Sequence, residues 1–165
     1  MEKERLKYNM DRFDAYYNSV NSKCGVFLAL STFIVGGLAT AYSPIIKAVD
    51  CGWCIHALMS TLIGLGVMIM IIVIRASTPF LDSKKKSLFY FGCIAGMERE
   101  TYFSKSKAYS GEDELTDLRS QVHDLATGLR LKFRRLRFAG WLFTIQFLLF
   151  IPLLITLIHN LKQNP

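Results

Sequence analysis

Charged residues are missing from three long stretches of the 165-residue sequence, and this absence defines its class. Residues 24–46, 51–74 and 138–161 contain no Lys, Arg, Asp or Glu. Each stretch exceeds the roughly 20 apolar residues that a helix needs to cross a bilayer. A helix on the surface of a soluble protein would carry charges on its wet face. The sequence therefore predicts an all-α membrane protein with three transmembrane helices, over residues 24–46, 55–74 and 138–159.

Motifs for catalysis and metal binding are also missing. The sequence has no G-x-x-x-x-G-K-[ST], no G-x-G-x-x-G and no H-E-x-x-H, and it holds only 3 histidines. His56 and His159 belong to apolar stretches, apart from His123. We therefore expect no enzyme, no metal site and no cofactor. Cys51 and Cys54 form a C-x-x-C pair, for which we expect a structural disulfide or small-residue packing.

Basic residues are scarce between the first two apolar stretches and abundant elsewhere. Residues 1–23 hold 5 Lys or Arg and residues 75–137 hold 13, whereas residues 47–54 hold 1. The positive-inside rule then predicts that residues 1–23 and the insert 75–137 are cytoplasmic. The loop 47–54 and the tail 160–165 would be extracytoplasmic. Contact with anionic lipid accounts for the net charge of +7, and an anionic cytoplasmic ligand is the alternative.

Two cytoplasmic segments have the periodicity of amphipathic helices that continue into a transmembrane span. The apolar positions are Leu6, Met10, Phe13, Tyr17 and Val20 in the first, and Leu115, Leu118, Val122, Leu125, Leu129, Phe133 and Leu136 in the second. Ser110 with Asp113 fits a capping box at the start of the second helix. We expect the two helices to pack in parallel as a stalk. Between them, we expect a strand or a loop at residues 87–92 and a short helix at 98–108.

Polar and small residues inside the spans need neighbours. Gln146 lies near the middle of the third span, and a buried amide in lipid requires a partner, so it should face protein. Pairs of small residues four apart permit close helix approach. They are Gly36 with Thr40, Gly37 with Ala41, and Ser60 with Gly64. We expect these pairs to pack within the chain, with contact between subunits as the alternative.

The remaining polar residues and aromatic side chains suggest a ligand site on the cytoplasmic side. Cations could neutralise a phosphate, aromatic rings could stack on a base, and polar groups could read base edges or sugar hydroxyls. The cations are Arg12, Lys23, Arg130 and Lys132, and the rings are those of Tyr16, Tyr17, Phe89, Tyr90 and Phe91. From the whole set, the candidate ligand-binding residues are Arg12, Asp14, Asn18, Asn21, Lys23, Tyr90, Phe91, Gln121, His123 and Lys132.

Three stretches, taken together, resemble one family. The first is D-R-x-D followed by S-x-N-x-K over residues 11–23, and the second is S-L-F-Y-F-G-C-I-A over residues 87–95. The third is D-L-x-x-Q-V-H-x-L-A over residues 117–126, followed by K-F-x-x-L-R before the last span. Their order and spacing resemble the Pycsar effector transmembrane family (PycTM-like) of bacterial anti-phage defence. One departure is Cys93, at a position where the family pattern leads us to expect an acid.

The resemblance implies a signalling mechanism. A partner cyclase would make a cyclic pyrimidine mononucleotide, cCMP or cUMP, and the effector would bind it on the cytoplasmic side of the bacterial inner membrane. Impaired membrane integrity would then cause abortive infection. We expect a homo-oligomer in the lipid bilayer, with no nucleic acid polymer as partner. A non-catalytic membrane scaffold or accessory subunit without a nucleotide is the competing interpretation. A small transporter or channel is disfavoured because the spans lack intramembrane charges.

Overall fold

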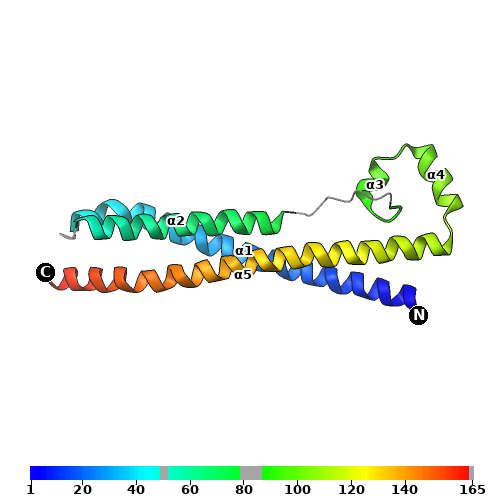
Figure 1. Cartoon of the computed structure of the whole chain (residues 1–165). Helices are drawn as coiled ribbons and strands as arrows, with labels where there is room; N and C mark the ends of the chain where they lie inside the picture. The colour runs from blue at the N-terminus through cyan, green and yellow to red at the C-terminus, as the bar shows by residue number, and fades with distance from the viewer. Residues whose placement is uncertain (49–51, 79–86, 164–165) are drawn as a thin grey trace. The chain divides into compact units, whose positions relative to one another are not determined.

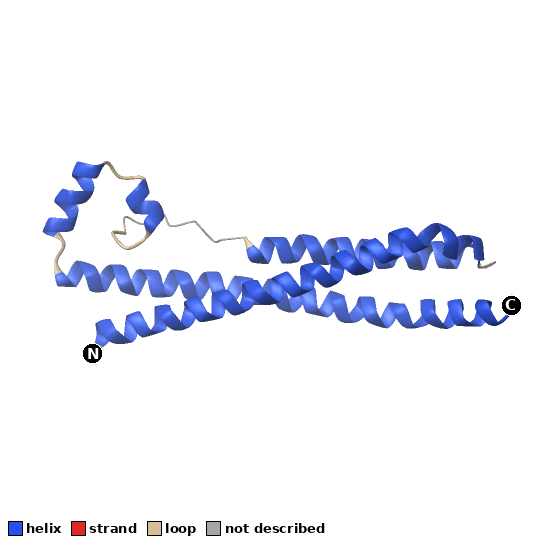
Figure 2. Cartoon of the chain, turned by 180° about the vertical axis from the view of Figure 1, so that it is seen from behind, coloured by secondary structure: helices blue, strands red, loops and turns tan. Residues whose placement is uncertain are grey.

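In the computed structural model, residues 1–48, 52–78 and 87–163 are described, and they are mostly helical (Figure 2). The elements are α1 (Glu2–Ala48), α2 (Gly52–Ser77), α3 (Phe91–Ala95), α4 (Arg99–Ala108) and α5 (Gly111–Gln163) (Figure 1). α1, α2 and α5 are long and apolar enough to cross a membrane. The predicted all-α class with three membrane helices is confirmed.

Two details of the predicted elements are settled by these bounds. Residues 87–90 form a loop that leads into α3, so the loop alternative is correct for this part of the chain. The short helix expected at 98–108 is α4, with Glu98 at its N-cap. The expected disulfide or packing at Cys51 and Cys54 cannot be placed, because Cys51 lies outside the described residues.

The chain divides into two compact units, and α1 and α5 contribute to both. We call Met1–Ser19 with Thr78–Leu131 the polar unit, and Val20–Ser77 with Lys132–Pro165 the span unit. The span unit contains the three uncharged stretches found in the sequence. Each unit is described below by itself.

In the polar unit, the N-terminal part of α1 packs against the N-terminal part of α5, as the two apolar stripes predict. Leu6 and Leu118 are buried, and the Tyr17 hydroxyl donates to the carbonyl of Leu125 at 3.0 Å. Ion pairs border the contact, with Lys3 Nζ 2.6 Å from Glu114 and Arg119 bound to Glu2 at 2.8 Å. Exposed pairs of this kind add little stability, so the apolar stripe holds the helices together.

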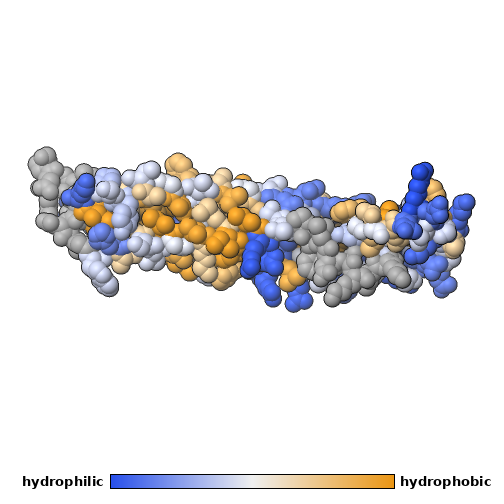
Figure 3. All heavy atoms as spheres, turned by 90° about the horizontal axis from the view of Figure 1, so that it is seen from above, coloured by the Kyte–Doolittle hydropathy of each residue, from blue (hydrophilic) through white to orange (hydrophobic). Residues whose placement is uncertain are grey.

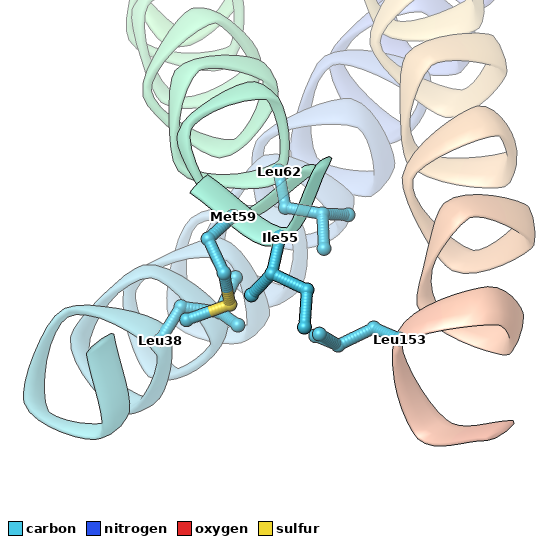
Figure 4. Close-up of a cluster of buried hydrophobic side chains, with 5 residues drawn as sticks. All are labelled: Leu38, Ile55, Met59, Leu62 and Leu153. Carbon is cyan, nitrogen blue, oxygen red and sulfur yellow. The ribbon is translucent and has the colours of Figure 1, made fainter. Parts of the chain in front are cut away.

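The core of the span unit is a cluster of apolar side chains from all three long helices. Leu38 of α1 and Leu153 of α5 meet Ile55, Met59 and Leu62 of α2, and all five are buried (Figure 4). Between helices in lipid, such contacts act through van der Waals packing rather than through removal of apolar surface from water. Shape complementarity at these positions therefore determines how α1, α2 and α5 meet.

Gln146 faces protein, as predicted. Its side chain is fully buried in the span unit, and its Nε2 donates to the carbonyl of Leu62 in α2 at 3.0 Å. Beside it, Gly66 allows α1 and α2 to approach closely. A Cβ at Gly66 would lie 2.4 Å from Val35 Cγ2 and 3.0 Å from Gln146 Nε2. No side chain fits there unless its neighbours move.

We predict that Gly66→Ala destabilises the span unit, whereas Gly64→Ala does not. The β-branched Val35 has little freedom to move aside, so the added methyl should cost about 1–3 kcal/mol through overpacking. A Cβ at Gly64 meets no atom within 4 Å, which makes it a matched control in the same helix. Thermal unfolding in detergent measures both variants. Equal melting temperatures for the two would show that the close approach at Gly66 is not needed.

The expectation that the small-residue pairs pack within the chain is wrong for their glycines. Cβ atoms built at Gly36, Gly37 and Gly64 meet nothing within 4 Å. The physical reason is that α1 turns a different face, the one with Leu38, toward α2 and α5. The faces with Gly36, Gly37 and Gly64 are left open.

A second difference concerns the end of the apolar stripe in α5. The stripe predicts Phe133 as a buried position, but Phe133 is 39% exposed and Lys132 is only 4% exposed. The Lys132 ammonium donates to the carbonyl of Ser77 at 3.1 Å and to Asn21 Oδ1 at 3.3 Å. Arg135 donates to the carbonyl of Arg75 at 2.7 Å. Lysine therefore takes the inner position because it satisfies the Ser77 carbonyl, and Arg135 the Arg75 carbonyl, which the last turn of α2 leaves without helical partners.

Candidate ligand-binding site

α5 begins with the predicted capping box. The backbone amide of Asp113 donates to Ser110 Oγ at 3.2 Å, and the backbone amide of Ser110 donates to Asp113 Oδ2 at 3.1 Å. The Ser110 hydroxyl also donates to Asp113 Oδ2 at 2.6 Å, and this bond, followed by the one from the Ser110 amide, lowers the pKa of Asp113. The cap fixes where the helix starts, so Asp117 and Gln121 follow at intervals of four residues and lie on the same helix face.

Asp117 anchors the loop at residues 87–90. Its Oδ2 accepts hydrogen bonds from the Ser87 hydroxyl at 2.8 Å and from the Leu88 amide at 3.0 Å. Gln121 adds a third link, because its Nε2 donates to Ser87 Oγ at 3.0 Å and to Asp117 Oδ1 at 3.3 Å. The loop is thereby tied to α5 at its first two residues.

Tyr109, just before α5, completes this network from the other side. Its hydroxyl donates to Asp117 Oδ2 at 2.9 Å. Burial, together with this bond and the carboxylate charge, raises the pKa of Tyr109 from 10.0 to about 12. The phenol therefore stays protonated and remains a donor at neutral pH. We call Ser87, Tyr109, Asp117 and Gln121 the anchor network.

The anchored loop presents aromatic rings. Ser87 Oγ accepts from the backbone amides of Phe89 and Tyr90 at 3.1 and 3.0 Å, which fixes the turn. The Tyr90 and Phe91 ring centroids lie 5.0 Å apart, and a Cβ at Gly92 would lie 2.7 Å from Tyr90 Cε1. Phe89 and Phe91 are 45% and 66% exposed. Two large rings are thus held in a fixed backbone conformation with their surfaces accessible.

The other candidates in the polar unit lie on α1 and further along α5. Arg12 is exposed, donates to the Tyr16 hydroxyl at 2.7 Å and lies 5.8 Å from the Tyr8 ring centroid. Asp14 and Asn18 are exposed on the same helix. His123 is exposed, with its Nδ1 3.6 Å from an Asp124 carboxylate oxygen. These side chains are accessible to a ligand.

Three candidates belong to the span unit instead. Asn21 and Lys132 are brought together, as described, whereas Lys23 is exposed. Burial lowers the pKa of Lys132, with Arg135 adding to the effect, and its ammonium donates to the neutral oxygens of Ser77 and Asn21. Lys132 therefore holds helices together in this structure.

The sequence-based candidates include Gln121 of the anchor network, and Tyr90 and Phe91 beside it, but not Ser87, Tyr109 or Asp117. The signal was present in the spacing of Asp113, Asp117 and Gln121, which places three polar groups on one face of α5. Which residues would contact this face of α5 depends on the path of residues 87–90, and no local sequence pattern predicts that path. For metal binding, the described ranges contain no group of three or more His, Cys, Asp or Glu side chains placed to hold an ion.

The three long apolar helices and the polar unit define the chain as a multi-span α-helical membrane protein. The family model of the Pycsar effector protein domain (PycTM) matches residues 5–159. The chain belongs to this family, and the resemblance drawn from the three sequence stretches is confirmed. It is a membrane effector of anti-phage defence, from a family of membrane effectors rather than of known enzymes. No curated protein and no solved structure matches the chain.

Proposed function

We propose that the polar unit binds a cyclic pyrimidine mononucleotide, cCMP or cUMP, and that binding leads the span unit to impair the inner membrane. The observation that carries the proposal is the aromatic loop held by the anchor network. Four polar side chains fix a turn whose main exposed features are the rings of Phe89 and Phe91. A binding surface that is already ordered avoids the entropy cost of ordering upon binding.

The chemistry of the polar unit suits a nucleotide. A pyrimidine base can stack on an exposed ring such as Phe91, a contact worth about 1–3 kcal/mol in proteins that bind single bases. Accessible cations, Arg12 and Arg130, are available in the same unit to neutralise the cyclic phosphate. Membership in a family of anti-phage effectors supports a signal made during infection.

The wider scheme is part of the same proposal. A partner cyclase supplies the nucleotide on the cytoplasmic side, where positive-inside bias places residues 1–23 and 75–137. The effector forms a homo-oligomer, and the open glycines Gly36, Gly37 and Gly64 support contact between subunits. Binding alters how α1 and α5 pack in the polar unit, and these continuous helices carry the change into the spans. Membrane damage then stops growth of the infected cell.

A ligand screen on the full-length protein tests the proposal. Thermal unfolding in detergent is measured with a panel of cyclic mononucleotides and cyclic dinucleotides. We expect saturable stabilisation by one cyclic pyrimidine mononucleotide at micromolar concentration. Phe91→Ala should weaken binding by about tenfold through lost stacking. Phe103→Ala is the matched control, because Phe103 is 49% exposed and packs under Arg99 in α4.

The screen also separates the competing interpretation. No stabilisation by any nucleotide, from protein that is folded and uniformly oligomeric, would favour the membrane scaffold without a nucleotide ligand. Stabilisation by a cyclic dinucleotide alone would keep the receptor and overturn the choice of ligand. Equal losses of nucleotide affinity in Phe91→Ala and Phe103→Ala would show that the aromatic loop is not part of the binding site.

A further inference from the structure

A groove separate from the candidate ligand-binding site lies within the span unit, between α2 and α5. It has a volume of about 490 Å³ and is lined by Ile72, Arg75, Arg134, Arg135 and Phe138. This volume falls in the range of about 300–1,000 Å³ usual for small-molecule sites. Three guanidinium groups thus share one groove with two large apolar side chains.

The position of the groove along the helices matches a membrane boundary. The uncharged stretch of α2 ends at residue 74, and that of α5 begins at residue 138. Ile72 and Phe138 therefore belong to the apolar side of this boundary, and the arginines to the polar side. On the face drawn in Figure 3, hydrophobic residues gather over the part of the chain that holds α2, and strongly hydrophilic residues adjoin them.

The arginines of the groove lack acidic partners in their own unit. In the sequence of the span unit, Asp50 is the only acidic residue, and it lies outside the described residues. Arg135 already uses one N–H on the carbonyl of Arg75 at 2.7 Å. Three clustered cations without a carboxylate favour an anion, and guanidinium groups bind phosphate through paired hydrogen bonds.

We propose that this groove binds an anionic phospholipid. The headgroup phosphate lies between the guanidinium groups of Arg75 and Arg134, and an acyl chain lies along Ile72 and Phe138. Arg135 holds the end of α2 at the wall of the groove. Basic pockets between transmembrane helices are typical sites for anionic headgroups. A free nucleotide fits less well, because the groove offers apolar surface where a lipid has a hydrocarbon chain.

Lipid titration of the purified full-length protein tests this site. Dihexanoylphosphatidylglycerol is added in detergent, and unfolding is followed by tryptophan fluorescence. We expect saturable stabilisation of the wild type and about a tenfold higher half-saturating concentration for the Arg75→Gln, Arg134→Gln double variant. Arg137→Gln is the matched control. Arg137 is exposed, lies one turn after Arg134 and does not line the groove, so this variant should bind like the wild type.

The other arms of the titration distinguish the sources of the ligand. Equal stabilisation by dihexanoylphosphatidylcholine would remove the role of charge and overturn the proposal. Inorganic phosphate or cCMP that displaces the lipid at matched concentration would make the groove a phosphate or nucleotide site. An equal loss of lipid affinity in Arg137→Gln would show that general surface charge, rather than the groove, attracts the lipid. If the double variant does not fold, native mass spectrometry of the wild type decides, because the proposal requires preferential retention of the anionic lipid.

Discussion

Asp117→Asn is expected to weaken nucleotide binding by at least about tenfold and to abolish membrane damage at natural expression levels. Asp117 Oδ2 accepts from Ser87, Leu88 and Tyr109 at 2.8–3.0 Å. Each hydrogen bond to a charged group is worth about 1.5–3 kcal/mol, and an amide cannot accept all three. The aromatic loop would then lose its fixed conformation, and binding would have to supply the ordering free energy.

Calorimetric titration with the nucleotide measures the affinity of this variant. Asp124→Asn removes the same charge from the same helix, beside exposed His123, and should leave affinity close to that of the wild type. Unchanged affinity in Asp117→Asn would contradict the role of the anchor network. Loss of affinity in both variants would indicate a general effect of charge on α5.

The pKa of Tyr109 reports on the state of the anchor network. In Asp117→Asn, the pKa of Tyr109 should fall below about 12 and remain above 10.0, because burial, the largest cause, persists. The folded state holds the proton more tightly than the unfolded chain. This difference in the pKa of Tyr109 raises the free energy of unfolding. The contribution is complete below about pH 10 and is lost as the pH rises toward 12. In an absorbance titration, one of the 7 tyrosines should therefore lose its proton at a lower pH in the variant than in the wild type.

Arg137→Pro is expected to separate nucleotide binding from membrane damage. α5 runs without interruption over Gly111–Gln163, so residue 137 lies in a continuous helix. Proline removes one helical hydrogen bond and clashes with the preceding turn, which costs about 3 kcal/mol or more and bends the helix. The anchor network belongs to the polar unit, so affinity should persist while toxicity is lost.

Arg137→Ala is the control, since it removes the same exposed charge and keeps the helix intact. Nucleotide affinity, resistance of the protein to extraction from membranes at high pH, and leakage of a dye from vesicles are measured for both. Full leakage by a correctly inserted Arg137→Pro protein would exclude transmission along α5. Loss of leakage in Arg137→Ala would point to the charge instead.

The sequence was most informative where one interaction dominates. Uncharged stretches predicted the membrane helices, because a charge in lipid is costly whatever the neighbouring helices do. The capping box at Ser110 and the inward position of Gln146 followed because polar groups need hydrogen-bond partners, the first at a helix end and the second within lipid. The anchor network was only partly foreseen, because Ser87 and Asp117 meet through the path of the chain between them rather than through a local pattern.

The end of the stripe in α5 shows where hydropathy misled the prediction. A strict repeat of seven residues from Leu118 leads through Leu125 to Lys132, and Lys132 is the buried position, whereas the stripe took the apolar Phe133 beside it. The carbonyl of Ser77 and the side-chain amide of Asn21 give the Lys132 ammonium its partners there. Hydropathy alone cannot identify a lysine whose partners come from two other helices.

The bonds from Lys132 and Arg135 to the last turn of α2 set the register between α2 and α5. Sliding α2 along α5 would part the Ser77 and Arg75 carbonyls from their donors. Further along the span, the bond from Gln146 Nε2 to the Leu62 carbonyl ties the same two helices again. α2 and α5 are therefore fastened at two levels of the span unit, and a motion that separates them must break at least one of these hydrogen bonds.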